Sequence, residues 1–165
     1  MTDWQIYWAD FDAQVAEDWP PASPTDQPFG WWRTSNTRLV KSLLSPGDRL
    51  WLVTVGKLCG YKKKPDMYQV FLPQIVLFDD WDDNPGYCDP YDDTCDWRYR
   101  VWIHNHGCYS FDPPLLIEDI VFGFPPRDFP PDVPTGMRLQ TPRRIDHDTV
   151  TRLKGRLDKE RGITI

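Results

Sequence analysis

Proline is the feature of this sequence that most restricts its fold. The chain of 165 residues contains 17 prolines, most of them in the segments 20–28, 113–114 and 125–134. Each proline lacks a backbone N–H and disfavours helical geometry at the residue before it. We therefore expect short strands and loops over most of the chain, with little room for long helices.

Aromatic side chains supply most of the apolar content. The chain has nine Trp, seven Tyr and eight Phe, a composition that excludes a disordered acidic chain. Its length predicts a single domain, residues 1–165, which buries roughly 68–70% of its unfolded surface and needs neither disulfide nor metal to fold. No apolar run of about 20 residues is present, so we expect no transmembrane helix and no membrane partner. The segment 1–5 lacks the features of a signal peptide, and we expect a cytoplasmic protein.

Charge is distributed unevenly along the chain. With 19 Lys and Arg against 25 Asp and Glu, the net charge is −6. Residues 1–126 carry 10 basic and 19 acidic groups, whereas residues 127–165 carry 9 basic and 6 acidic groups. This balance argues against a protein that wraps duplex nucleic acid through a basic surface.

Residue patterns place the secondary structure. Ser35 and Asn36 can cap a short helix over 37–44, and Asp146 can cap a C-terminal basic helix that runs to about 161 and stops at Gly162. Alternating or continuous apolar runs predict strands, with Pro73 requiring an edge position or a bulge. The expected strands are 4–8, 49–55, 67–78, 98–104 and 115–124. The fold class is α+β: a small, mostly antiparallel curled sheet or partial β-barrel, with an early helix and a C-terminal helix.

One group of residues can form a flat, aromatic binding site. Aromatic faces stack on nucleobases at about 1–3 kcal/mol per base, and a neutral base requires no basic pocket. Polar side chains beside the rings can read a base edge. The alternative is that the indoles belong to the core and that the polar pair only caps the helix. The candidate ligand-binding residues are Trp31, Trp32, Ser35, Asn36, Trp51 and Trp102.

The order of these segments resembles the PUA-like superfamily. An aromatic entry at Phe29–Asn36 precedes a short helix, a Gly47-Asp48-Arg49-Leu50-Trp51 turn opens an apolar strand, and Gly56 closes that strand. EVE-type domains, relatives of the YTH, ASCH and SRA domains, are the most similar, and residues 138–145 are similar to the tail strand of their barrels. The resemblance implies a pseudobarrel that takes a modified or flipped base into an aromatic cage. By position, Trp32, Ser35, Asn36 and Trp51 would line that cage.

Cysteine and histidine residues offer a second kind of site. Thiolate and imidazole groups are the ligands that zinc prefers. The spacing here does not match the common C-x2-C pairs, so free or buried cysteines and a Cys88–Cys95 disulfide are alternatives. Otherwise we expect no cofactor. The candidate zinc ligands are Cys88, Cys95, His104, His106 and Cys108.

The acidic segment 79–97 contains eight Asp and no Lys or Arg. Carboxylate-rich loops bind Ca²⁺ or Mg²⁺, but the spacing here is not that of an EF-hand. We expect a solvated insert loop whose acidic residues, 79–96, could instead engage a basic partner protein. With His104 or His106, the same carboxylates could serve a metal-dependent hydrolase or nuclease.

Basic residues near the C-terminus complete the candidate site. Arg138, Arg143 and Arg144 could contact phosphates while the aromatic residues hold a base. The sequence therefore predicts a nucleic-acid-binding module that reads a modified or flipped base, DNA or RNA, and has no catalytic activity of its own. The alternatives are a protein-interaction or toxin/phage-defence accessory protein that uses the acidic loop, and a metal-dependent hydrolase.

Overall fold

The computed structural model of the chain describes residues 1–7, 29–34, 37–55, 70–83, 99–104, 106–117, 120 and 141–165. For residues 29–34, 54–55, 100 and 112–113 it describes the backbone alone. These parts of the chain form β1 (Asp3–Tyr7), β2 (Phe29–Thr34), η1 (Leu39–Leu43), β3 (Arg49–Val55), β4 (Val70–Asp83), β5 (Tyr99–Ile103), β6 (Tyr109–Leu116), β7 (Arg143–Arg144) and α4 (His147–Arg161).

The described strands form one mixed sheet. Their order is β2-β5-β4-β3-β1-β7, and β6 also pairs with β4. β1 and β3 run parallel, whereas the other pairs are antiparallel. β2 and β7 stand at the two ends of this order, so the described sheet is not closed. The expected small α+β fold is confirmed at this level.

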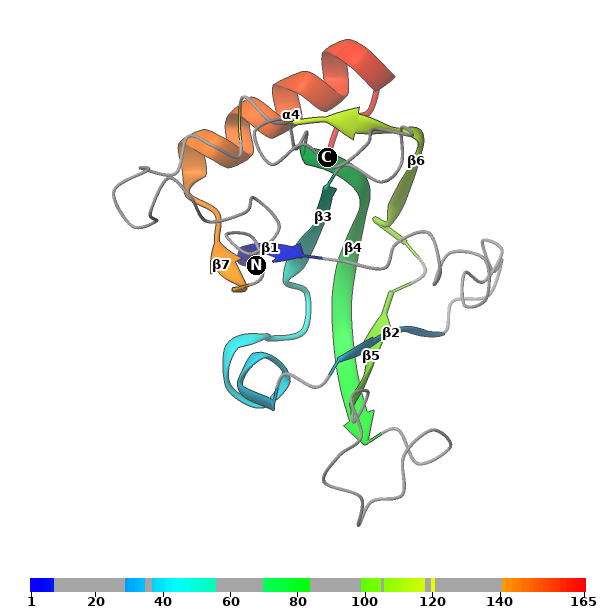
Figure 1. Ribbon diagram of the computed structural model, residues 1–165, viewed down its shortest axis with the longest axis vertical. Coiled ribbons are helices and arrows are strands. Elements are labelled where there is room, and N and C mark those ends of the chain that lie inside the picture. The colour runs from blue at the N-terminus through cyan, green and yellow to red at the C-terminus, as the bar shows by residue number, and fades with distance from the viewer. Residues whose placement is uncertain are drawn as a thin grey trace.

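β4 is the longest strand and the axis of the sheet (Figure 1). β3 pairs with it from Val70 to Leu77, and β5 pairs with it from Phe78 to Asp83. The sequence predicted that this strand would end at Phe78 and that an acidic loop would begin at Asp79. The strand instead continues to Asp83, because β5 supplies a pairing partner, most often an apolar or aromatic residue, along this extension.

Pro73 lies within β4. This strand pairs with β3, β5 and β6, so it is not an edge strand. Of the two predicted explanations, an edge position or a bulge, the bulge holds. The β3 register shifts between Leu52 and Thr54, and the β6 register shifts between Leu72 and Gln74. Because proline cannot donate to either ladder, both irregularities fall where its N–H is missing.

β6 differs from the strand expected at 115–124. It starts earlier, at Tyr109, and ends at Leu116. Pro113 and Pro114 lie within this strand, and the register between β6 and β4 skips the residues between Ser110 and Leu115. The prolines thus occupy an irregular stretch in which no ladder hydrogen bond is required of them.

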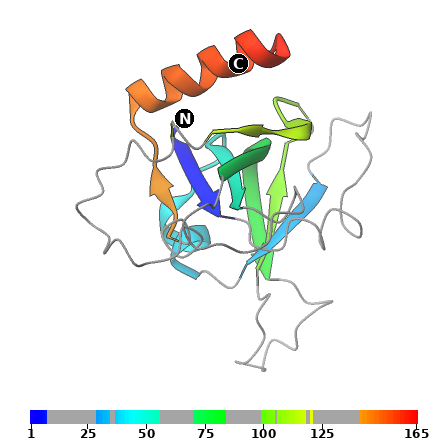
Figure 2. The same ribbon diagram turned by 45° about the horizontal axis from the view of Figure 1, so that its top comes forward.

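Apolar side chains fill both faces of the sheet. On one face, η1 contributes Leu39 and Val40 to a first core. On the other face, α4 contributes Val150, Leu153 and Leu157 to a second core. Figure 2 shows α4 lying across one end of the sheet, away from β2. The first core also contains Trp4, Ile6, Leu50, Leu52, Val76, Phe78, Tyr99, Val101 and Ile103.

The C-terminal helix matches its predicted bounds and caps. The Asp146 carboxylate accepts the Thr149 backbone N–H at 2.9 Å, and Gly162 ends the helix with φ +64°. Helices commonly end in a residue with left-handed backbone geometry, and that residue is usually glycine. Three buried residues at i, i+3 and i+7 spacing then hold the helix on the sheet.

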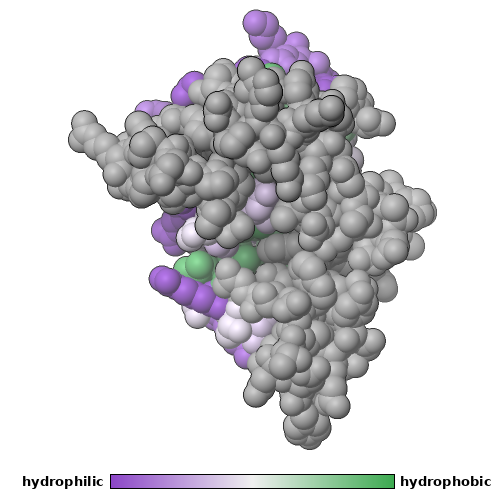
Figure 3. Space-filling view, in the orientation of Figure 1, coloured by the Kyte–Doolittle hydropathy of each residue, from purple (hydrophilic) through white to green (hydrophobic). Residues whose placement is uncertain are grey.

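Among the described residues, no helix is long and apolar enough to cross a membrane. The large hydrophobic side chains exposed in this part of the chain are Met1 and Leu116. In the view of Figure 3, the described surface is mostly hydrophilic and carries a small hydrophobic patch.

Candidate functional site

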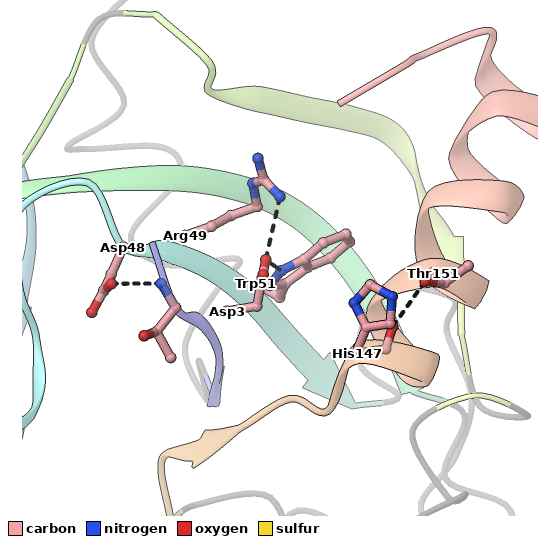
Figure 4. Close-up of polar contacts among 7 residues, drawn as sticks. Asp3, Asp48, Arg49, Trp51, His147 and Thr151 are labelled. Carbon is pink, nitrogen blue, oxygen red and sulfur yellow. Dashed lines mark hydrogen bonds and ion pairs between the residues drawn. The ribbon is translucent and has the colours of Figure 1, made fainter.

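The Gly47-Asp48 turn, which carries the resemblance, is a structural joint. The Asp48 carboxylate is buried and accepts the backbone N–H groups of Thr2 and Ser45 and the indole N–H of Trp4. The backbone of Gly47 and Asp48 also bonds to Phe78 of β4. This turn therefore joins β1, β3 and β4, and Figure 4 shows the Asp48 carboxylate meeting the N-terminal segment.

Trp51, a predicted ligand-binding residue, lies in the second core. Its side chain is 1% exposed, and its indole N–H donates to the Asp3 carboxylate at 2.7 Å. The same carboxylate accepts Arg49 at 3.3 Å (Figure 4). Trp51 therefore belongs to the core, which is the alternative that the sequence left open for these indoles. It lies apart from the other candidates.

Trp102 lies on the face of β5 opposite the first core. Its neighbours Val101 and Ile103 are fully buried, and side chains alternate along a strand. Trp102 is half-buried, and its indole N–H donates to Asp82 at 3.0 Å. In the register, Asp80 of β4 and Gly30 of β2 flank it. The residue opposite Trp102 on β2 is thus Gly30, which has no side chain of its own.

The remaining aromatic-site candidates are placed only in part. Trp31 and Trp32 belong to β2, where Trp32 pairs with Val101 and the register shifts between Gly30 and Trp32. Their side chains lie outside the described part of the structure, as do Ser35 and Asn36 in full. The register does bring the backbone of Trp32 next to the strand that carries Trp102.

His104 and His106 lie at an interruption of the β-ladder beside Leu77 of β4. The Leu77 carbonyl accepts the His104 N–H at 3.0 Å, but the Leu77 N–H donates to the Cys108 sulfur at 3.5 Å. Cys108 in turn donates to the His104 carbonyl at 3.0 Å. The sulfur thus replaces the backbone acceptor that β4 would otherwise find, and His106 and Gly107 lie outside the ladder.

His104 pairs with a carboxylate at this break. Its Nε2 lies 3.2 Å from Asp79 Oδ1, and its ring centroid lies 5.1 Å from that of His106. Among the described residues, however, no group of three His, Cys, Asp or Glu side chains could hold a metal ion. The other predicted ligands, Cys88 and Cys95, lie outside the described residues.

Cys108 faces the protein interior and not the histidine rings. Its side chain packs against the first core, and burial raises the pKa of its thiol, with the Leu77 N–H acting in the opposite direction. Metal ligation requires the thiolate. At neutral pH this cysteine is a protonated hydrogen-bonding group, which is a structural role that the His104-x-His106-x-Cys108 spacing did not reveal.

An aromatic corner near the end of β4 was missed by the sequence analysis. The rings of Trp81 and Tyr99 are 5.4 Å apart and nearly perpendicular, at 86°. The ammonium group of Lys41, from η1, lies 5.3 Å from the centroid of each ring. The alternation Asp80-Trp81-Asp82 was the available signal, because it continues the strand pattern into the acidic segment.

The predicted phosphate contacts are distant from Trp102 in the strand order. Arg143 and Arg144 form β7, which pairs with β1, whereas Trp102 lies on β5 beyond β4 and β3. The Arg144 guanidinium lies over the Trp4 ring, 5.4 Å from its centroid. Arg138 lies outside the described residues. Arg143 and Arg144 therefore lie at the opposite end of the sheet from Trp102, and Trp51 lies between them on β3.

Comparison of the chain with protein-family models, with curated proteins and with solved structures found no match. The β4–β5 end of the sheet carries Trp102 with its carboxylate partner and the Lys41 aromatic corner.

Proposed function

We propose that the chain is a nucleic-acid-binding module that stacks a nucleobase, modified or flipped, on the indole of Trp102. The supporting observations are the burial of that ring, its hydrogen bond and its neighbour on β2. It is half-buried, its N–H is held by Asp82, and it has a glycine across the sheet on β2. A ring already fixed in orientation loses little conformational freedom when a base stacks on it.

Asp80 lies directly across from Trp102 on β4 and is exposed. One of its oxygens accepts the Trp81 N–H at 2.8 Å. A carboxylate accepts hydrogen bonds, so it favours base edges that present N–H donors, such as the amino group of cytosine. The same carboxylates repel phosphates locally, so the backbone of the bound strand would run toward the basic β7 end of the sheet.

The proposal retains a PUA-like pseudobarrel as the fold. Its support is the Gly47-Asp48 turn into β3 and the short β7, which corresponds to the tail strand of the resemblance. In this arrangement Arg143 and Arg144 contact phosphates some distance along the strand from the stacked base.

Fluorescence anisotropy with labelled single-stranded DNA and RNA tests the proposal. The oligonucleotides carry plain, methylated or hydroxymethylated bases. Trp102→Phe keeps an aromatic face, whereas Trp102→Leu removes it. We expect Trp102→Leu to weaken binding by about 5- to 150-fold, equivalent to about 1–3 kcal/mol of stacking, and Trp102→Phe to retain most of the affinity. Leu116→Ala, an exposed apolar truncation on β6, serves as the matched control.

Absence of binding by the wild-type chain to every strand would contradict the proposal, as would equal affinity of the wild type and Trp102→Leu. A second candidate function is docking of a basic partner protein on the acidic end of β4. The exposed carboxylates of Asp80 and Asp83 favour it. A partner that co-purifies with the wild type and is lost from the double variant Asp80→Asn/Asp83→Asn would support that alternative.

A further inference from the structure

We propose that Trp81 and Tyr99 form a binding site for an alkylated ammonium group and that Lys41 occupies this site as the protein's own ligand. This site is separate from the Trp102 surface, because Trp81 pairs with Val101 and shares the core side of the sheet. The inference does not depend on nucleic-acid binding.

The geometry of the two rings is that of a corner. Their planes are nearly perpendicular, and the Lys41 ammonium lies over both of them at equal distance, 5.3 Å from each centroid. A cation within about 6 Å of a ring centroid is attracted by the negative face of the ring. Two rings at a right angle therefore surround the cation from two directions.

Both rings are fixed before any ligand arrives. Tyr99 is 1% exposed, and its hydroxyl shares a 3.0 Å hydrogen bond with Thr37. Trp81 is half-buried and packs against the first core. A preorganised pair of aromatic walls gives up little entropy on binding, so this corner suits recognition of an external group.

Lys41 is held by the rings and not by a carboxylate. It lies in the wide turn of η1, in which the Leu44 N–H bonds to the Leu39 carbonyl, and single turns of this kind often occur at functional sites. Among the described residues, no carboxylate forms an ion pair with Lys41, although four Asp flank Trp81 in the sequence of β4. Lys41 is an exposed residue, whereas Tyr99 is 1% exposed with the lysine in place, so a ligand would reach the corner by displacing Lys41.

The chemistry of the corner favours alkylated nitrogen over a free ammonium. A lysine ammonium is strongly hydrated and has three N–H donors, which ring faces satisfy poorly. Methyl groups on nitrogen remove those donors while the positive charge remains, and aromatic cages are a known means of recognising such groups. Asp83, opposite Tyr99 in the register and exposed, adds negative potential at the rim.

Ligand-observed NMR of the N-methyl protons of choline, with the full chain, tests the site. The Lys41→Ala variant removes the internal competitor and should bind choline about 2- to 5-fold more tightly than the wild type, the range expected from an exposed cation–π contact. Lys41→Gln is the second variant, in case the shorter side chain perturbs η1. Lys159→Ala, at an exposed lysine of α4, is the matched control and should behave as the wild type.

Two comparisons separate recognition of charge from nonspecific contact. The uncharged isostere of choline, in which carbon replaces nitrogen, should not bind, and Lys41→Ala/Trp81→Leu should not bind choline. Trp102→Leu should bind it normally. A folded Lys41→Ala or Lys41→Gln that ignores choline overturns the proposal, as does equal binding of the isostere.

A trimethyllysine peptide and its unmethylated counterpart identify the source of the group. Tighter binding of the methylated peptide than of choline indicates a methylated protein partner. Tighter binding of choline indicates a small quaternary amine. Both outcomes support the ammonium site. If neither probe binds, the proposal is contradicted.

Discussion

The indole N–H of Trp4 donates to the buried carboxylate of Asp48, 3.1 Å away and 44 positions along the chain. The same oxygen, Oδ2, accepts the Ser45 N–H at 3.0 Å, and Oδ1 accepts the Thr2 N–H at 2.7 Å. One carboxylate thus satisfies three donors from two segments. This convergence explains why an acidic residue is buried between β1 and β3.

Replacing Asp48 by asparagine should destabilise the fold. The amide keeps the shape of the carboxylate, but its NH₂ group cannot accept, so at least one buried donor is left unpaired. We expect a loss of about 1–3 kcal/mol in the free energy of unfolding, measured by urea denaturation. Asp83→Asn, at an exposed site on β4, should change stability by less than about 0.5 kcal/mol. A similar effect of both substitutions would contradict this account.

Two glycine-to-alanine substitutions should have opposite effects. Gly107 has φ +67°, and a Cβ there would lie 2.6 Å from Leu77 Cδ1. Gly155 lies within α4, and its Cβ would meet nothing within 4 Å. We expect Gly107→Ala to cost about 1–2 kcal/mol and Gly155→Ala to stabilise by about 0.4–1 kcal/mol. Thermal unfolding measures both, and a stabilised Gly107→Ala would show that the ladder break is not rigid.

The Cys108 thiol should react slowly with alkylating reagents. Burial raises its pKa, so its alkylation rate should reach half its maximum above about pH 8.5, the ordinary cysteine value. A variant that keeps Cys108 as its only cysteine allows the measurement. Because the folded protein holds the proton more tightly, the thiol's contribution to stability is present at neutral pH and is lost as the pH rises through the raised pKa.

The hydrogen-bonding role of Cys108 has a separate test. Serine can still accept the Leu77 N–H and donate to the His104 carbonyl, whereas alanine can do neither. Cys108→Ala should therefore be less stable than Cys108→Ser by about 1 kcal/mol. Equal stabilities would show that the sulfur contacts contribute little.

Acid should weaken the start of α4. The Thr149 backbone N–H and hydroxyl lower the pKa of Asp146, so the carboxylate stabilises the helix above about pH 3.9 and this contribution is lost as the pH falls through the lowered pKa. An asparagine at this position would cap equally well without titrating. The difference in stability between wild type and Asp146→Asn should therefore vary between about pH 2 and 5 and remain constant above. A constant difference throughout would contradict the assignment.

Local patterns predicted the elements whose signals are contained in a short segment. β3 matched its expected range because its apolar run is bounded by a turn and a glycine. α4 matched because Asp146 and Gly162 mark its ends. The extension of β4 to Asp83 was missed because four Asp outweighed one Trp in the pattern, whereas in the fold β5 supplies the pairing that keeps these residues extended.

The candidate site was less accessible from sequence. Composition does not tell a core indole from a half-buried one. Trp51 is packed in the second core under α4, whereas Trp102 lies on β5 and is half-buried. The Lys41 corner joins η1, β4 and β5, which are separated by tens of residues, so no spacing rule contains it. Histidine and cysteine spacing likewise predicted shared ligation at His104 and Cys108, but the cysteine side chain turns to the backbone of Leu77.

The contact between Leu77 and the Cys108 sulfur has a mechanical consequence. β6 pairs with β4 as far as Ile75, β3 pairs with it as far as Leu77, and β5 pairs with it from Phe78 onward. A bond to sulfur at 3.5 Å is softer than the 3.0 Å bond to oxygen beside it. We therefore expect the β6-facing edge of β4 to open more easily at Leu77 than where its amides bond to oxygen.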